Sequence, residues 1–96
     1  MREHNYFVYI LASKRNGTLY TGLTNSLSRR MWEHKSGFVK GVTDTYNVKT
    51  LVWFEYHSDI NAAISRENRI KKWRRDWKLD IIEQTNPNWV DLSGSL

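Results

Sequence analysis

The chain has 96 residues and no cysteine, which leaves room for one domain and excludes a disulfide framework, a cysteine-ligated zinc site and a cysteine nucleophile. An apolar share of 40%, with five tryptophans and five tyrosines, supports a packed core and excludes a disordered chain. Fifteen Lys and Arg against ten Asp and Glu give a net charge of +5, which favours a polyanionic partner, either nucleic acid or an anionic membrane surface, over a merely soluble basic protein.

A β-hairpin is predicted near the start of the chain. Residues 6–11 (YFVYIL) form a continuous run of β-formers that indicates a buried strand. Asn16-Gly17, a strong turn dipeptide, precedes a second predicted strand at residues 19–23. No apolar run in the first eleven residues reaches the length of a signal peptide or a membrane span, so we expect a cytoplasmic protein.

A short helix follows the hairpin. Any of residues 24–26 (TNS) could cap a helix over about residues 27–35, and Gly37 is placed to end it. Residues 38–49 show no clear period and are expected to be irregular.

The second half predicts one strand and one long helix. Residues 51–57 (LVWFEYH) read as the third strand, and Ser58 or Asp59 can cap a helix over about residues 60–83. A break in that helix is expected near Arg75-Asp76.

A tail follows Pro87, which ends helical structure; Trp89 is expected to dock on the domain and residues 93–96 to be frayed. The predicted order is ββαβα. We therefore expect a single α+β domain with a small antiparallel three-stranded sheet flanked by helices.

One acidic residue interrupts the apolar face of the predicted long helix. Glu67 falls in the middle of an arc of residues that repeat at about 100° each. A carboxylate on a core-facing stripe is costly to desolvate and is rarely there without a partner. Glu67 is therefore in an ion pair with a nearby arginine, turned to solvent, or a metal ligand or catalytic group at the sheet edge. The arc consists of Ile60, Ala63, Ile70, Trp77 and Ile81.

The same helix carries much of the positive charge. Between positions 66 and 78, seven basic and two acidic side chains give a local net charge of +5. Such a run is often only a solvated face, but its one-sidedness favours a surface that follows phosphates. Because Trp77 shares the apolar arc, we expect Trp73 and Trp77 in the core rather than as platforms for base stacking.

Two residue pairs in the first half have a structural and a chemical interpretation. Arg30 and His34 are four positions apart and share a helix face. They are either structural, or they hold a phosphate and stabilise charge that develops on it. Tyr9 and Tyr20 lie on adjacent predicted strands. They are either core or rim residues, or one of them lies beside a metal and an arginine that lower its pKa, so that it serves as a general base.

These residues occur in a familiar order. The sequence resembles the GIY-YIG nuclease family, and within it the small stand-alone bacterial proteins related to the catalytic module of the excision-repair nuclease. The resemblance covers residues 6–92, which we take as one nuclease-like domain. It is carried by Phe7-Val8-Tyr9 at the GIY position, Tyr20-Thr21-Gly22 at the YIG position, the series from Asn25 to Arg30 with His34, and the segment Arg66-Glu67-Asn68.

The resemblance implies a metal-dependent phosphodiesterase that hydrolyses nucleic acid, DNA rather than RNA. No membrane role is expected, because the basic helix also carries its apolar residues into the predicted core. It implies one divalent cation, Mg²⁺ or Mn²⁺, bound by Glu67 and acting as a Lewis acid. By the same resemblance, Gly22 allows a close backbone approach. The strand would be held by Lys71, Lys72, Arg74 and Arg75.

The resemblance also implies roles for the remaining site residues. Tyr20 would accept a proton from the attacking water, with Tyr9 as a relay. Arg30 would neutralise the phosphate, and His34 would orient groups or relay protons. Two other interpretations stay open: a nucleic-acid-binding module with a degenerate site, and a nuclease subunit that cuts only when docked on a protein partner. Exposed tryptophans near Trp89 would favour the second.

Overall fold

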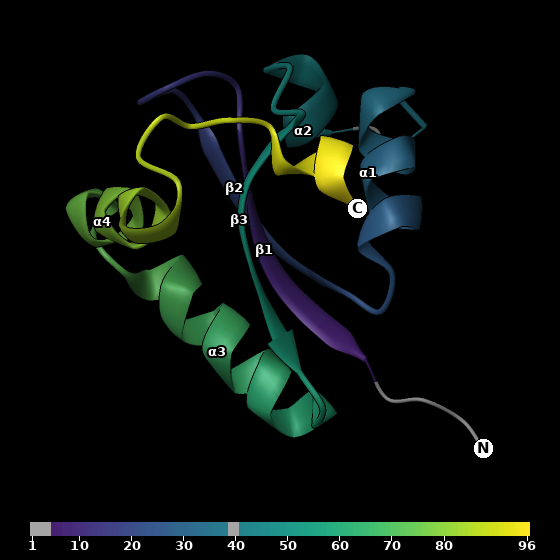
Figure 1. Ribbon diagram of the computed structural model, residues 1–96, viewed down its shortest axis with the longest axis vertical. Helices are drawn as coiled ribbons and strands as arrows, with labels where there is room; N and C mark the ends of the chain where they lie inside the picture. Colours follow the sequence, from purple (N-terminus) through teal and green to yellow (C-terminus); the bar gives the residue numbers. More distant parts are fainter. Residues whose placement is uncertain (1–4, 39–40) are drawn as a thin grey trace.

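The structure, a computed structural model, describes residues 5–38 and 41–96. These residues form a three-stranded antiparallel sheet in the order β2-β1-β3, with helices against both faces (Figure 1). The α+β class and the antiparallel sheet are thereby confirmed. The predicted order ββαβα gains two short elements, α2 and a 3₁₀ helix, and its last helix is divided into α3 and α4. The elements are β1 (Tyr6–Ala12), β2 (Leu19–Thr24), α1 (Leu27–Lys35), α2 (Val42–Thr45), β3 (Thr50–His57), α3 (Ile60–Lys72), α4 (Arg75–Thr85) and the 3₁₀ helix η1 (Leu92–Ser95).

The central strand β1 divides its side chains between two hydrophobic clusters, because alternate residues of a strand point to opposite faces. Val8 and Ile10 belong to the cluster that α3 and α4 cover, which we call the α3 face. Tyr9 and Leu11 belong to the cluster that α1 covers, the α1 face. Both faces of this small sheet are thus covered by helices. Because side chains alternate along a strand, the position of each hairpin residue in its strand decides which face it lies on.

The predicted helix caps are confirmed. The Ser26 side chain accepts a backbone hydrogen bond from the first turn of α1, and the Asp59 side chain does the same for α3. Gly37, with a φ of +74°, follows the end of α1 in the left-handed region that glycine tolerates. The expectation that residues 38–49 are irregular is wrong in part, since α2 forms within them; residues 39–40 lie outside the described residues.

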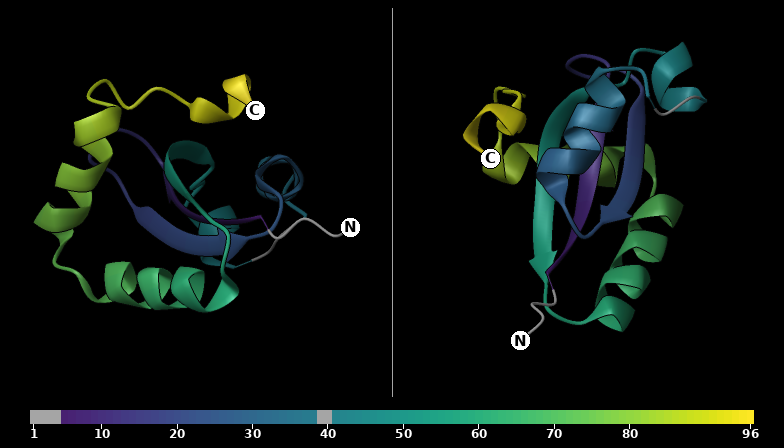
Figure 2. Two further views of the ribbon diagram at one scale, coloured as in Figure 1. Left: turned by 60° about the horizontal axis from the view of Figure 1, so that its bottom comes forward. Right: turned by 90° about the vertical axis from the view of Figure 1, so that its right-hand side faces the viewer.

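The predicted long helix is two helices. Trp73 and Arg74 have extended backbone, with ψ of 150° and 154°, so α3 ends and α4 begins slightly before the predicted break at Arg75-Asp76. Figure 2 shows the two helices meeting at an elbow. The backbone carbonyl of Lys71 near the end of α3 accepts a hydrogen bond from the Lys78 ammonium at 3.5 Å.

The elbow changes which residues reach the core. Ala63 and Ile70 are fully buried as predicted, whereas Ile60 and Trp77 are 37% and 52% exposed. The expectation that Trp77 is a core residue is therefore wrong. The apolar arc assumed one straight helix, and the change of direction at Trp73 turns Trp77 away from the core, while Ile81 still packs against it. Ile60 is the first residue of α3.

The C-terminal segment covers the β3 edge of the sheet. Trp89 docks as predicted: it is 7% exposed, and its indole N–H donates to the Glu83 carboxylate at 2.7 Å. The Asn86 side-chain amide donates to the Val52 carbonyl at 3.1 Å, and a 3₁₀ helix replaces the frayed end predicted for residues 93–96. No helix in the described part of the chain is long and apolar enough to cross a membrane.

Candidate active site

Three aromatic rings meet on the α1 face. Tyr9 comes from β1, Tyr20 from β2 and His34 from the inward side of α1. The ring centroids lie 6.4 Å apart for the two tyrosines, 6.3 Å for Tyr9 and His34, and 5.8 Å for Tyr20 and His34. The structure thus brings together three of the predicted site residues from three elements, and we call this group the aromatic triangle.

Gly22 makes room for this arrangement. It is the strand partner of Tyr9, and a Cβ on Gly22 would overlap the hydroxyl and Cζ of the Tyr9 ring. The ring therefore passes over β2 toward the edge of the sheet. The sequence suggested that Gly22 allows a close approach of backbone, whereas in the structure the space above it is filled by Tyr9.

His34 is held on both sides of its ring. Its Nε2 lies 3.5 Å from the Tyr9 hydroxyl, and its Nδ1 lies 3.2 Å from Thr43 Oγ1 of α2. Burial, Arg30 and Lys49 lower the pKa of His34, and the Glu33 carboxylate opposes them only in part. The ring is therefore neutral near pH 7, so one nitrogen donates a hydrogen bond while the other accepts one.

Tyr9 is a protonated phenol in this setting. Burial raises its pKa, and the neighbouring Tyr20, Glu67 and Glu33 raise it further, while Arg30 lowers it. A group with a raised pKa holds its proton and is a poor phenolate base. The geometry suits Tyr9 as a hydrogen-bond donor or proton relay next to Tyr20, and it places Glu67 within electrostatic reach of the Tyr9 hydroxyl.

Arg30 lies between the triangle and an open hollow. Its guanidinium is 3.3 Å from the Glu33 carboxylate, and its Nε is buried without a hydrogen-bond partner among the described residues. Arg30 also lines a hollow of about 280 Å³ between α1, the end of β2 and the start of α3. Sequence reasoning missed Glu33, although its spacing of three from Arg30 is a helical pair signal. It also missed Thr43, which no sequence pattern marks.

Glu67 is a partly buried carboxylate on α3. Its side chain is 16% exposed and forms an ion pair with Lys71, one helical turn later, at 3.2 Å. The ion-pair interpretation therefore holds, with a lysine in place of the expected arginine. Within residues 5–38 and 41–96, no group of three or more His, Asp or Glu side chains is placed to hold a metal ion. A cation at Glu67 would have one protein carboxylate as its ligand.

The four predicted strand-binding cations differ in their surroundings. Lys71 faces Glu67, and Lys72 is exposed without an ion pair to any described residue. Arg74 pairs with Asp76 at 2.9 Å. Arg75 donates to the carbonyls of Asn16 and Gly17 in the hairpin turn, at 2.7 and 2.6 Å. Arg75 thus joins α4 to the β1–β2 turn, a role that the charge pattern did not reveal.

Known proteins share this sequence and fold. A model of the GIY-YIG catalytic domain matches residues 5–80. A UPF0213 protein of Clostridium perfringens is 41% identical over 76 residues, covering 79% of this chain and 81% of the relative; another, of Staphylococcus haemolyticus, is 37% identical and covers 82% and 95%. The solution NMR structure of a UPF0213 protein from Bacillus halodurans, 25% identical, has a TM-score of 0.57 and covers 91% of this chain and 92% of that one. The chain therefore belongs to the GIY-YIG catalytic domain family, a family of nucleases.

Proposed function

We propose that the protein is a metal-dependent nuclease that hydrolyses phosphodiester bonds, with DNA preferred to RNA. The observation that carries the proposal is the convergence of Tyr9, Tyr20 and His34 on one face, with Arg30 and Glu67 close enough to alter the pKa of Tyr9. These residues come from four different elements. Arg30 also keeps a third of its side chain exposed beside a hollow, where an anion can reach it.

The donor set around Glu67 fits a hard divalent cation of low intrinsic affinity. Mg²⁺ commonly keeps several waters and uses one or two carboxylates together with substrate phosphates. Glu67 supplies one such carboxylate, and Lys71 would give up its ion pair to a more highly charged partner. When bound, the cation supplies Lewis-acid polarisation of the scissile phosphate. Mn²⁺ has the same preference for oxygen ligands, and we propose either ion.

The protein's own residues would divide the remaining tasks. Arg30 would bind a phosphate oxygen from its hollow with the exposed part of its guanidinium, since its side chain is 33% exposed and guanidinium–phosphate contacts are strong and directional. Tyr20, the outer member of the triangle, would accept a proton from the attacking water. Tyr20 would at the same time lose its own hydroxyl proton to Tyr9. Tyr9 would lose its proton to Nε2 of neutral His34 through their contact at 3.5 Å, so that His34 would finally hold the proton.

A cleavage assay with a matched pair of variants tests this function. Wild type, Glu67→Gln and Asp76→Asn would be purified identically and incubated with plasmid, single-stranded and branched DNA and with RNA, in Mg²⁺, Mn²⁺ or EDTA. We expect metal-dependent cutting by wild type and by Asp76→Asn, because Asp76 is an exposed carboxylate of the same basic segment. Glu67→Gln is expected to bind DNA without cutting it.

The outcomes separate the alternatives. Equal cutting by wild type and Glu67→Gln would show a contaminant or a different mechanism. Absence of cutting with salt-sensitive DNA binding intact would favour the binding-module interpretation, and cutting only after addition of a cell extract would favour a subunit that needs a partner. The burial of Trp89 means that this side chain offers no exposed docking site for such a partner.

A further inference from the structure

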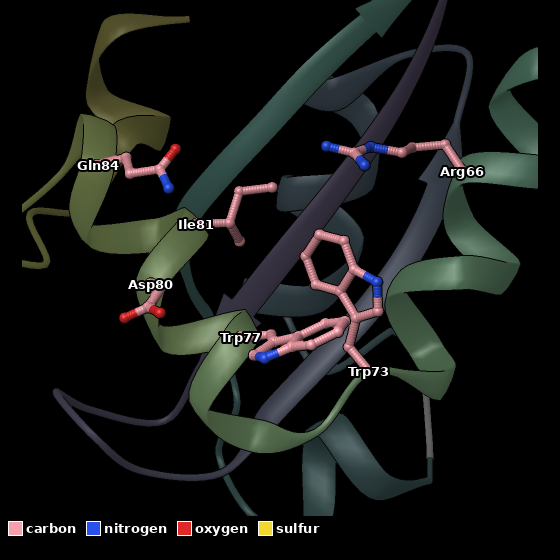
Figure 3. A pocket seen from close by; sticks show the side chains of 6 residues that line it. All are labelled: Arg66, Trp73, Trp77, Asp80, Ile81 and Gln84. Carbon is pink, nitrogen blue, oxygen red and sulfur yellow. The ribbon is translucent and has the colours of Figure 1, made fainter.

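A hollow of about 320 Å³ lies in the elbow between α3 and α4 (Figure 3). The rings of Trp73 and Trp77 meet edge to face with centroids 6.0 Å apart, and the Arg66 guanidinium lies 5.3 Å from the Trp73 ring centre. Arg66 and Gln84 point into the hollow from opposite sides. Its volume is at the lower end of the range of about 300–1,000 Å³ for small-ligand sites. The Glu55 carboxylate holds the Arg66 guanidinium over Trp73 through two hydrogen bonds, at 3.0 and 3.3 Å. The exposed indole of Trp77 then offers the surface that suits a flat aromatic ligand.

The charge around the hollow indicates what carries that ligand. The segment from residue 66 to residue 78 has a net charge of +5, which attracts a polyanion to the elbow. The lining of the hollow itself contains one cation, Arg66, and one anion, Asp80, so the hollow suits the uncharged base of the polyanion better than its phosphates. Trp73 also lines a second hollow, of about 460 Å³, with Arg75, Lys78, Thr18 and Leu19. Trp73 therefore lies between two hollows: this basic hollow beside β2, and the hollow in the elbow that Trp77 also lines.

The link between the hollow and the candidate active site is α3, which carries Glu67. Leu19, in the basic hollow, packs on the α3 face, whereas the next residue, Tyr20, packs on the α1 face. Trp73 follows Glu67 by six positions, which is about 9 Å along a helix axis. That distance corresponds to roughly two or three stacked nucleotides at about 3.4 Å each.

We propose that the hollow lined by Trp73 and Trp77 binds one unpaired nucleobase of the strand that is cut, so that the substrate is nucleic acid with a single-stranded segment. The inference rests on the proposed nuclease function and adds the substrate class. In a duplex both faces of each base are already stacked, so only an unpaired base can enter. Trp77 is 52% exposed before any ligand binds, so part of its ring is open to a stacking base. Stacking on an aromatic ring tolerates any base sequence.

Binding measurements on a chain that cannot cut test this proposal. In the Glu67→Gln background, affinities would be measured by fluorescence anisotropy for oligothymidylate and for the same backbone with every base removed, which carries the same phosphates. We expect oligothymidylate to bind more tightly, and Trp77→Ala to reduce that preference by about fivefold or more. Trp77→Phe, which keeps an aromatic face, is expected to restore most of it.

Two control variants make the result specific. Trp32→Ala in α1 removes a tryptophan that is 62% exposed on another surface, and it should leave the preference for bases unchanged. Lys72→Ala should weaken both oligonucleotides in parallel. The base-binding site would be overturned if Trp77→Ala kept the preference for oligothymidylate, or if Trp32→Ala lost as much of it. If the protein still bound duplex DNA in that case, the proposed nuclease function would stand. A wild type that binds no DNA of any form would overturn the proposed function itself.

Discussion

The ring of Tyr9 occupies the space in which residue 22 would carry a Cβ. Gly22→Ala is therefore expected to lower the free energy of unfolding by about 1–3 kcal/mol, because an inserted methyl forces a well-packed ring to move. The same movement would separate Tyr9 from His34 and reduce cleavage. Urea unfolding and the cleavage assay measure the two effects, and Gly94→Ala is the control, since nothing lies within 4 Å of a Cβ there.

The overlap also predicts a coupling between the two positions. If the ring is what the new methyl meets, Tyr9→Ala should reduce the cost of Gly22→Ala, so the double variant is more stable than the sum of the two single losses indicates. Strictly additive losses would mean that the Gly22→Ala effect comes from somewhere other than the Tyr9 ring.

The pH dependence of stability should carry a signature of His34. Its pKa in the folded protein is lowered by burial and by Arg30, while an exposed histidine in the unfolded chain titrates near about 6.5. Above that pH the ring is neutral in both states and contributes nothing. As the pH falls below it, the unfolded chain binds a proton that the folded protein does not. The free energy of unfolding then falls by up to about 1.4 kcal/mol per pH unit until the folded pKa is passed.

Replacement by a residue that does not titrate should remove this slope. His34→Gln is expected to show a flatter dependence than wild type between about pH 6.5 and pH 5, whatever its absolute stability. Urea unfolding series at each pH make the comparison, and parallel curves for the two proteins would contradict the assignment of a neutral, buried His34.

Arg75 and Lys72 are predicted to differ although both belong to the basic segment. Arg75→Ala removes the hydrogen bonds to the Asn16 and Gly17 carbonyls and should cost about 1–2 kcal/mol of stability. Arg75→Lys should recover part of the loss, because both hydrogen bonds come from the single nitrogen Nη2 and an ammonium can also donate more than one. Lys72→Ala should leave stability within about 0.5 kcal/mol of wild type and weaken DNA binding instead. Thermal unfolding and DNA-binding measurements on both variants would show whether Arg75→Ala mainly lowers stability and Lys72→Ala mainly lowers affinity.

The salt dependence of binding should report the basic segment as a whole. Each phosphate contact on duplex DNA contributes about 0.9 to the slope of log affinity against log salt. Replacing Lys71, Lys72 and Arg74 together by alanine is expected to reduce that slope by up to about 2–3 units, equally for different sequences. A slope equal to that of wild type would place the DNA on another surface.

Much of the candidate site follows from the sequence because it depends on local geometry. Strand parity puts Tyr9 and Tyr20 on one face, and a spacing of four puts Arg30 and His34 on one side of a helix. These rules hold within single elements and across one hairpin. The order of the family motif then indicates which of those elements meet.

The features that the sequence did not predict depend on where the chain changes direction. The exposure of Trp77 follows from the turn at Trp73 and Arg74, where no glycine or proline signals a helix end. The contact of Thr43 with His34 depends on α2, whose four residues are too few to show a period. The bonds from Arg75 join residues almost sixty positions apart.

The C-terminal segment has a consequence for self-association. Exposed edge strands recruit other chains through their unpaired backbone groups. At the β3 edge the Asn86 side chain binds the Val52 carbonyl, and the Asp91 carboxylate accepts from the Leu51 N–H at 3.3 Å. These side chains stand in for a neighbouring strand, so a chain cut after Thr85 would present β3 as a template for aggregation. The opposite edge is β2, which carries Tyr20 and Gly22, and strand addition there would block the approach of substrate.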